Sequence, residues 1–331
     1  MRVMELARPG PAQSGPLRAA TRPELRPGPG EIRVEVEACA VCRTDLQIVE
    51  GDLAARTLPI VPGHQVVGRV VEAGGEVDHS WVGRRVGIGW LASTCGACDM
   101  CRRGLENLCR RAVFTGWDRD GGFASETVAR ADFAYPIPDG LSAVDAAPLL
   151  CGGIIGYRAF KLAGVGPGDR LGLYGFGASA LLVAQVARHR GSELFVVTRG
   201  AEAQERARAL GAAWVGSLGQ RPPVQLQAAI TFAPVGQVVV EALEALDRAG
   251  VCVVNAIHLD RVPEFAYQHL YWERRIQSVA NFTRQDSAEL LRLATDIPIR
   301  TQHETYPLEE ANVALTRLKE DHVSGAAVLV P

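Results

Sequence analysis

Four closely spaced cysteines are the clearest sign of chemistry in this sequence. Cys95, Cys98, Cys101 and Cys109 follow a C-x2-C-x2-C-x7-C pattern. Four thiolates at such spacing can surround one tetrahedral ion, and zinc suits a closed all-sulfur shell without redox chemistry. An iron–sulfur cluster also takes four cysteines, but its usual bacterial spacing ends in C-x3-C-P. We therefore predict a structural zinc ion that stabilises the loop. Because four cysteines leave no open coordination position, this ion would take no part in catalysis.

A second set of possible ligands is scattered along the chain. Cys39 and Cys42 lie three residues apart in CAVCRTDL, His64 lies in VPGHQVVG, and Cys151 lies in APLLCGG. The cysteine pair alone could be a redox couple, half of a zinc knuckle, or one ligand beside a non-ligand. A catalytic zinc needs three protein ligands and an exchangeable position. Spacing alone does not join these residues, because a single histidine is commonly structural and a single cysteine commonly a small buried apolar residue.

The elements that must position these residues fall into two regions. From Glu31 to about Tyr135, short apolar or alternating runs between glycines and prolines predict a β-rich, barrel-like domain. After Leu141 a helical stretch precedes a strand–helix series, which predicts a parallel sheet with helices on both faces. The expected strands are 170–176, 193–199, 212–216, 228–234, 251–259 and 326–330, and the expected helices are 178–191, 201–211, 237–250, 287–297 and 309–320.

A glycine-rich turn begins the strand–helix series. GFGASA, residues 175–180, follows an expected strand and opens an expected helix. In that context its glycines let backbone N–H groups and the helix amino terminus approach a pyrophosphate closely. The predicted cofactor contacts at this turn are Gly175, Phe176, Gly177, Ala178 and Ser179.

The end of the next expected strand bears on cofactor choice. It carries Thr198 and Arg199, and Arg199 lies 199 − 177 = 22 residues after Gly177. A chain that binds the ribose 2′-hydroxyl of NAD usually has Asp or Glu about 20 residues on. A guanidinium and a hydroxyl suit a 2′-phosphate instead. We predict a preference for NADP(H), with NAD(H) as the alternative if Arg199 is only a solvated loop charge.

Composition excludes several classes of function. The net charge is −2 with the charges interspersed, so we expect no nucleic-acid partner. No apolar run approaches the roughly 20 residues of a membrane span, and the N-terminal segment lacks a signal-peptide core. We therefore expect a cytoplasmic protein without a membrane partner. A chain of 331 residues, 47% of them hydrophobic, should form two domains.

Taken together and in this order, CAVCRTDL, PGHQVVG, the four-cysteine loop, APLLCGGIIGYRA and GFGASA resemble the zinc-dependent medium-chain alcohol dehydrogenases over essentially the whole chain. The resemblance implies an α/β fold in which a GroES-like, β-rich catalytic domain spans residues 1–152 and 284–331. A Rossmann nucleotide-binding domain, a doubly wound parallel sheet, would span residues 153–283. It also implies two zinc ions per chain and a homodimer or homotetramer that pairs through edge strands of the nucleotide-binding sheet.

The resemblance assigns the scattered ligands. Cys42, His64 and Cys151 would hold a catalytic zinc, and Cys39 would not be a ligand. Two thiolates and a neutral imidazole cancel the charge of Zn²⁺, leaving the ion able to polarise a neutral alcohol and lower its pKa. The bound alkoxide could then release a hydride to the nicotinamide, and Thr44 would take the alcohol proton.

Four neighbouring positions complete this interpretation. Asp45 would orient the ligands from outside, and Arg43 would contact the cofactor phosphates. Gln47 stands where many relatives have a histidine that ends the proton relay, so we expect the proton to leave by another route such as water. Gln65 stands where the commoner motif reads Gly-His-Glu, so a carboxylate near the metal is replaced without loss of a ligand.

The function implied by the resemblance is that of an alcohol dehydrogenase or aldehyde reductase acting on a small molecule. An apolar, aromatic pocket favours hydrophobic primary alcohols and aldehydes over sugars. The alternative from another class is a non-catalytic zinc- and NADPH-binding redox sensor whose thiolates release metal on oxidation. A zinc-free quinone-reductase branch of the same fold is disfavoured by the intact ligand set. The resemblance places the walls of the substrate cleft at Trp90, Leu91, Phe114 and Trp117.

Overall fold

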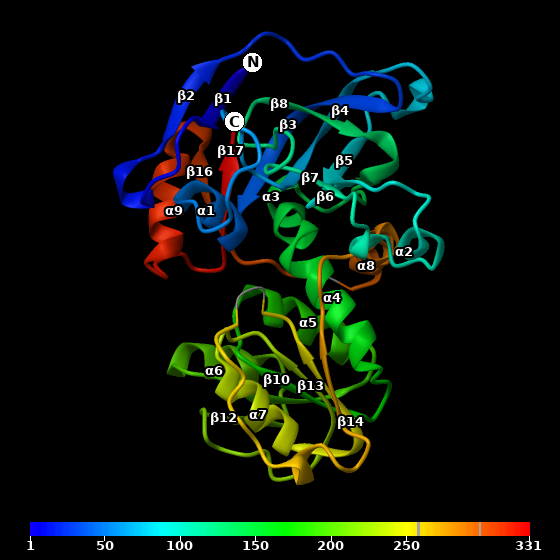
Figure 1. The fold of residues 1–331 in the computed structure, drawn as a ribbon, viewed down its shortest axis with the longest axis vertical. Coiled ribbons are helices and arrows are strands. Elements are labelled where there is room, and N and C mark those ends of the chain that lie inside the picture. Colours follow the sequence, from blue (N-terminus) through cyan, green and yellow to red (C-terminus); the bar gives the residue numbers. More distant parts are fainter. Residues whose placement is uncertain (257–258, 298) are drawn as a thin grey trace. The chain divides into compact units, whose positions relative to one another are not determined.

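The computed structural model describes residues 1–256, 259–297 and 299–331, which form two compact units (Figure 1). Unit 1 comprises Met1–Cys151, Asn281–Thr295 and Arg300–Pro331, and unit 2 comprises Gly152–Ala280 and Asp296–Ile299. Residues 257–258 of the expected strand 251–259 lie outside the described residues. No helix within the described ranges is long and apolar enough to cross a membrane.

A seven-stranded sheet forms the centre of unit 1. Its long strand β3 (Glu31–Val41) pairs antiparallel with three neighbours, and its apolar side chains alternate towards the core, as the sequence pattern predicts. The other strands of this sheet are β4 (Gln65–Ala73), β5 (Arg85–Ile88), β8 (Glu126–Arg130), β9 (Ala134–Pro136), β16 (His303–Pro307) and β17 (Ala326–Val330).

Two small two-stranded sheets and several helices complete unit 1. These sheets pair β1 (Arg2–Leu6) with β2 (Leu17–Thr21), and β6 (Leu91–Ser93) with β7 (Val113–Phe114), both antiparallel. The helices are α1 (Arg43–Glu50), α2 (Asp99–Arg102), α3 (Ala143–Ala146), α8 (Arg284–Asp296) and α9 (Ala311–Lys319). The α1 helix continues directly from the end of β3, which carries the chain from the core into the first predicted ligand segment.

Unit 2 is a six-stranded sheet in which every neighbouring pair of strands is parallel. The order is β12 (Trp214–Gly216), β11 (Glu193–Val197), β10 (Arg170–Tyr174), β13 (Leu226–Thr231), β14 (Leu246–Val254) and β15 (Arg275–Ser278). The winding direction reverses between β10 and β13, the point at which such sheets bind nucleotides beyond the carboxyl ends of their strands.

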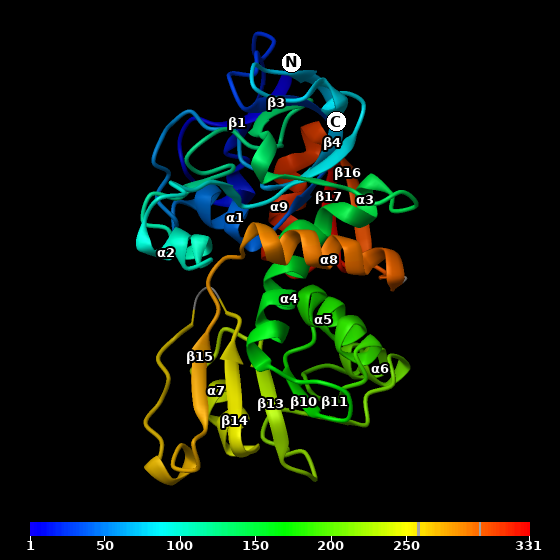
Figure 2. The same ribbon diagram turned by 90° about the vertical axis from the view of Figure 1, so that its right-hand side faces the viewer.

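Helices cover both faces of this sheet (Figure 2). The α4 helix (Gly152–Ala163) packs beside α5 (Ala178–His189), whereas α7 (Gly236–Glu244) packs on β13 and β14 from the other side. A further helix, α6 (Ala201–Ala209), joins β11 to β12. The predicted α/β class, with a doubly wound parallel sheet beside a β-rich region, is confirmed.

One predicted helix is too long. We expected a helix over 237–250, but α7 ends at Glu244 and the chain enters β14 at Leu246. Leu246 is fully buried and pairs with Leu226 on β13, and Ala249 has φ +60°, which a helix does not accommodate. Strand pairing therefore overrides the local helical pattern of EALEALD.

Candidate active site

Cys42 joins β3 to α1 and caps the amino end of that helix. Its Sγ accepts a hydrogen bond from Thr44 N–H at 3.3 Å, and its own N–H donates to Asp45 Oδ2 at 2.9 Å. The amino end of a helix carries a positive partial charge that favours a thiolate. Hydrogen bonding with Cys151 lowers the pKa of Cys42 well below its ordinary value, and the neighbouring His64 adds to this against the effect of burial. Cys42 is therefore placed to act as a thiolate ligand.

His64 lies in the turn that leads into β4. Its preceding residue, Gly63, has φ +99°, and a Cβ there would lie 2.5 Å from the Phe123 ring. Only glycine therefore allows this turn. His64 is fully buried, and its Nε2 lies 3.3 Å from Cys42 Sγ.

Asp45 links these two segments. Its Oδ1 accepts a hydrogen bond from Gly63 N–H at 3.1 Å and lies 2.9 Å from His64 Nδ1. With Nδ1–H donated to the carboxylate, the Nε2 lone pair of His64 faces Cys42 and is free for a metal ion. Burial raises the pKa of Asp45, while the imidazole opposes this rise. Burial alone would lower the pKa of His64, but the negative charges of Asp45 and Cys42 raise it well above its ordinary value, and the same charges attract a cation.

Cys151 lies where the expected helical stretch 141–164 breaks. After α3 a 3₁₀ turn (Ala147–Leu150) is followed by Cys151, with φ −131° and ψ −76°, before α4 begins at Gly152. This break brings the thiol to the other candidates: the ligand atoms of Cys42, His64 and Cys151 all lie within 4.8 Å of one another. Ligands of a tetrahedral zinc are separated by about 3.5–3.8 Å, given its bond lengths. The three residues therefore fit a metal ion.

Cys39 is not part of this group. It is fully buried on β3, and burial raises its pKa well above the ordinary value of a thiol. Among the described residues, the ligand atoms that gather within 4.8 Å of one another belong to Cys42, His64 and Cys151, without Cys39.

The four-cysteine loop forms a second group in unit 1. The Sγ atoms of Cys98 and Cys101 are 3.5 Å apart, as are those of Cys95 and Cys109. The crossed pairs, Cys95 with Cys101 and Cys98 with Cys109, are 3.9 Å apart. Backbone N–H groups of Ala97 and Cys98 lower the pKa of Cys95 to about 5. These spacings match the edges of a tetrahedral all-sulfur site, so the loop fits one zinc ion.

A stack of aromatic rings begins at His64. The Trp90 ring meets the imidazole edge-on with centroids 5.0 Å apart, and it stacks on Phe114 at 5.0 Å and Trp117 at 5.9 Å. All three aromatic rings are partly exposed. Leu91, in contrast, is fully buried in β6. Leu91 therefore belongs to the core, whereas the three aromatic residues that were predicted with it as walls of the substrate cleft are partly exposed.

Other predicted residues lie close to the ligands without joining them. Thr44 is buried in the first turn of α1. Gln65 is buried, and its Nε2 donates to Ala40 O at 3.3 Å. The exposed Arg43 forms an ion pair with Asp321, which precedes β17.

The glycine-rich turn lies at the carboxyl end of β10. Gly175 has φ +94°, and a Cβ there would lie 3.2 Å from Ala233 N. Gly177 is the N-cap of α5, and no described atom lies within 4 Å of a Cβ built on it. Ser179 Oγ donates to Gly152 O at 2.6 Å, which ties α5 to α4. Phe176 is buried and Ala178 begins the helix. The open space beside Gly177 and the helix amino terminus suit a phosphate.

The end of β11 carries the two residues that were predicted to determine the preference for NADP(H) over NAD(H). Thr198 is buried, and its N–H donates to Gly216 O at 2.9 Å. Arg199 is exposed directly after it. The nearest acids on α6 have basic partners on the same helix: Glu202 with Arg206, and Glu205 with Arg208.

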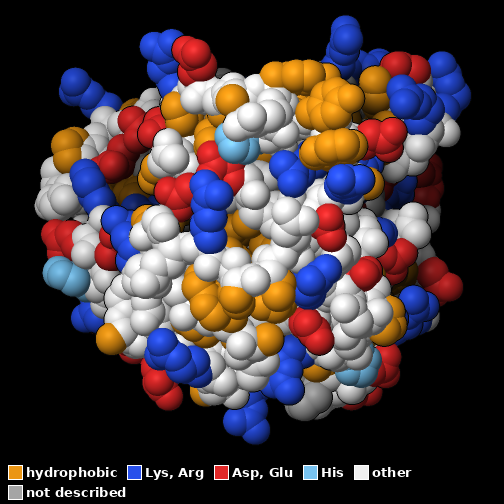
Figure 3. Space-filling view, turned by 90° about the horizontal axis from the view of Figure 1, so that it is seen from below, with side chains coloured by type: hydrophobic (Ala, Val, Ile, Leu, Met, Phe, Trp, Pro, Cys, Tyr) orange, Lys and Arg blue, Asp and Glu red, His pale blue; other side chains and the backbone are white. Residues whose placement is uncertain are grey.

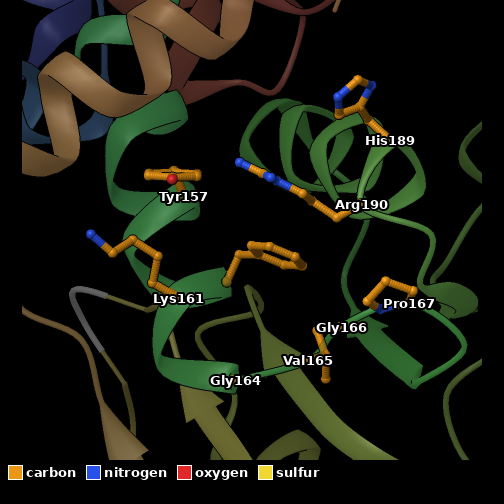
Figure 4. A pocket seen from close by; sticks show the side chains of 9 residues that line it. Tyr157, Lys161, Gly164, Val165, Gly166, Pro167, His189 and Arg190 are labelled. Atoms are coloured by element: carbon orange, nitrogen blue, oxygen red, sulfur yellow. The ribbon is translucent and has the colours of Figure 1, made fainter.

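A hollow of about 510 Å³ in unit 2 lies apart from this turn (Figure 4). Tyr157 and Lys161 of α4 and Arg190 at the end of α5 line it, together with the loop 164–167. That loop precedes β10, whereas the glycine-rich turn follows it, so the two lie at opposite ends of the strand. Lys161 and Arg190 lie at the carboxyl ends of α4 and α5, where a basic side chain offsets the helix dipole. The positive charge of the hollow therefore has a structural explanation.

Sequence reasoning missed two residues beside the aromatic stack. The guanidinium of Arg56 lies over the Trp117 ring at 4.0 Å, and Arg56 Nη1 donates to Asp118 Oδ1 at 2.8 Å. Neither lies in a motif, and they are 62 residues apart in the sequence, so no local signal could have found the pair.

The chain is similar to known proteins over its whole length. Residues 28–139 match the model of the alcohol dehydrogenase GroES-like domain. The chain is 49% identical to a probable alcohol dehydrogenase of Mycobacterium tuberculosis, over 100% of this chain and 97% of that protein. It is 35% identical to an alcohol dehydrogenase of Geobacillus stearothermophilus, over 91% and 92%. A solved structure of a cinnamyl alcohol dehydrogenase from Sorghum bicolor has a TM-score of 0.89 at 26% identity, covering 99% of this chain and 97% of that one.

Proposed function

The chain belongs to the zinc-dependent medium-chain alcohol dehydrogenase family, and on that premise we propose that it interconverts hydrophobic primary alcohols and aldehydes with NADP(H) at a zinc held by Cys42, His64 and Cys151. The names of the relatives support the alcohol dehydrogenase activity. They give no reason to prefer a sensor without turnover.

The single observation that carries this proposal is the meeting of three potential ligands from distant segments. Their ligand atoms lie within 4.8 Å of one another. Three protein ligands leave one position for substrate, which distinguishes this group from the closed four-cysteine group. When bound, zinc polarises the hydroxyl oxygen of an alcohol and lowers its pKa towards neutrality.

The residues around the ligands have separate tasks in this proposal. Asp45 holds the His64 ring in the orientation that directs Nε2 to the metal position. Thr44, two residues after Cys42, accepts the proton of the alcohol hydroxyl. Gln47, which lies later on α1, does not titrate, so water carries the proton onward. A nicotinamide cofactor held in unit 2 would supply the hydride acceptor for oxidation of an alcohol to an aldehyde, and the hydride donor for the reverse reaction.

The preference for NADP(H) rests on unit 2. The pyrophosphate would lie at the open amino terminus of α5 beside Gly177, and the exposed Arg199 would pair with the 2′-phosphate. No acid follows β11 at 198–200 to accept the 2′-hydroxyl of NAD. A bidentate guanidinium suits phosphate geometry better than a lone hydroxyl does.

Self-association through the edge strand β15 is a further part of the proposal. All four residues of β15 are exposed, and among the strands of the described residues only β14 pairs with it. Three exposed aromatic residues lie just before β15: Tyr267, Tyr271 and Trp272. The Tyr271 ring contacts both of the other rings edge-on. On the face drawn in Figure 3, hydrophobic side chains gather between charges of both signs. An exposed edge with such side chains suits pairing with a second copy.

Turnover and zinc content test the proposal together. NADPH oxidation is measured with a panel of aliphatic and aromatic aldehydes, on the wild type and on Cys42→Ser, and zinc is determined in both. We expect turnover with two zinc ions per chain in the wild type, and loss of one zinc together with the activity in the variant. A wild type that holds two zinc ions and binds NADPH but reduces no aldehyde would contradict the enzymatic function.

A further inference from the structure

We propose that Arg56 is a positioning residue that holds Trp117 in the aromatic stack beside His64 and thereby sets how well bulky alcohols bind relative to small ones. This inference rests on the proposed function, because it concerns the substrates of that same site. It is carried by the contacts of Arg56 and Asp118, two residues of unit 1 that belong to none of the motifs discussed above.

Trp117 is held from several directions. The Arg56 guanidinium lies 4.0 Å from the centroid of its ring. Its indole Nε1–H donates to Ala54 O at 2.9 Å. The ring also stacks on Trp90, at 5.9 Å and with 15° between the ring planes. Two of these contacts come from residues 51–59. The position of this segment and the position of the Trp117 ring therefore depend on each other.

Arg56 is itself fixed in orientation. Its Nη1 donates to Asp118 Oδ1 at 2.8 Å, and Asp118 Oδ2 accepts the N–H of Phe114 at 2.8 Å. The Asp118 side chain is 11% exposed, whereas that of Arg56 is 54% exposed. A planar guanidinium can stack on a ring and donate in its own plane at once, which an ammonium cannot do. Asp118 therefore connects Arg56 to β7, the strand that carries Phe114.

The segment that carries Arg56 is anchored to the rest of unit 1 at Leu53, whose N–H donates to Gln47 O at 3.0 Å and whose side chain packs against the core. Residues 51–59 form neither helix nor strand. Leu58 in this segment is exposed rather than packed in the core. Between Leu53 and Ile60, which pairs with Leu6, Arg56 and Ala54 O tie the segment to the Trp117 ring, so we expect removal of the guanidinium to loosen Trp117.

The stack connects this contact to the metal site. Trp90 contacts both Trp117 and His64, whose ring centroid is 5.0 Å from that of Trp90. A short alcohol at the metal position needs little beyond the ligands, whereas a bulky one must lie against the rings. Loosening Trp117 should therefore weaken binding of bulky alcohols selectively, because a rigid wall costs less to order on binding.

Steady-state kinetics with ethanol and benzyl alcohol on the full-length, zinc-loaded enzyme test the selectivity. For Arg56→Ala we expect KM for benzyl alcohol to rise about three- to tenfold, with kcat and the KM for ethanol changed less than about twofold. Arg56→Lys should lie between the wild type and Arg56→Ala. Arg84→Ala is the matched control, because Arg84 also lies over a ring, that of Trp81 at 5.7 Å. Equal changes for both alcohols, or none, would overturn the proposal.

Tryptophan fluorescence tests the contact without turnover. We expect acrylamide to quench Arg56→Ala more strongly than the wild type, and we expect this difference to vanish when both proteins also carry Trp117→Phe. A difference that persists without Trp117, or no difference at all, contradicts the positioning role. A wild type that oxidises neither alcohol overturns the proposed function and the selectivity with it, while the quenching result still decides whether Arg56 holds Trp117.

Discussion

Asp45 Oδ1 lies 2.9 Å from His64 Nδ1, and both side chains are fully buried. The same carboxylate accepts the N–H groups of Cys42 and Gly63. Asp45 thus sets the ring orientation of His64 and fixes the backbone at Cys42, which are two of the proposed ligands. Its burial is offset by these three contacts, since a buried carboxylate without partners is costly.

Replacing this carboxylate should weaken metal binding without removing a ligand. For Asp45→Asn we expect zinc affinity at the Cys42 site to fall about 10- to 100-fold, because an outer partner that orients a ligand is lost. Competition with a chelator measures this. Asp52→Asn, a nearby exposed aspartate, serves as the control and should retain wild-type affinity. An unchanged affinity in Asp45→Asn would mean that the contact is structural only.

The four-cysteine loop should contribute stability rather than chemistry. Cys101→Ser is expected to lose one zinc ion and to lower Tm by about 5–10 °C, since about 1 kcal/mol shifts Tm by 2–4 °C in a domain of this size. Thermal unfolding and zinc analysis measure both effects, with Arg103→Ala in the same loop as the control. Retention of two zinc ions by Cys101→Ser would contradict the site.

Cofactor preference should depend on one exposed guanidinium. For Arg199→Asp we expect the ratio of NADP to NAD efficiency to fall about 10- to 100-fold, because a charge-assisted hydrogen bond is replaced by repulsion. kcat/KM for the two cofactors measures this. Arg190→Asp, at the end of α5, controls for the change in net charge. If the ratio stays constant in Arg199→Asp, the preference lies elsewhere.

A carboxylate that joins α1 to α9 should make stability depend on pH. Glu50 accepts from Lys319 Nζ at 2.7 Å and from Ala12 N–H at 2.9 Å. Burial would raise the pKa of Glu50, but these two donors lower it below the ordinary value of 4.5. Because the pKa is lower in the folded than in the unfolded chain, this stabilisation is present above about pH 4.5 and is lost as pH falls through the folded pKa.

The corresponding variant is Glu50→Gln. We expect its free energy of unfolding to be about 1 kcal/mol below that of the wild type at pH 7, with a smaller difference near pH 3.5. Denaturant unfolding at the two pH values measures this. A difference that is the same at both pH values would show that the charge of Glu50 does not contribute.

Subunit pairing should respond to charge on the edge of the unit 2 sheet. Ile276 lies on β15 and is exposed. A charge there would face its own copy across a symmetric interface, so Ile276→Asp should shift the protein towards the monomer. Light scattering after size exclusion gives the mass. Val313→Asp, an exposed apolar position on α9, should leave the mass unchanged.

Local patterns in the sequence determined the parts of this protein that neighbouring residues encode. The spacing of Cys95, Cys98, Cys101 and Cys109 is short enough for one loop to bring the thiols together. The strand–turn–helix around Gly175 and Gly177 is likewise encoded by residues that are close in the chain. The alternation of strands and helices was sufficient for the doubly wound sheet, because side-chain periodicity follows from backbone geometry.

Only the tertiary structure decided what depends on distant segments. The end of α7 at Glu244 depends on pairing between β13 and β14. The helical preference of the local sequence does not predict this pairing. The placing of Arg56 over Trp117 and of Asp45 against His64 depends on how the strands of unit 1 pack. Contacts between residues far apart in the chain form only when the core brings their elements together, and so no local spacing predicts them.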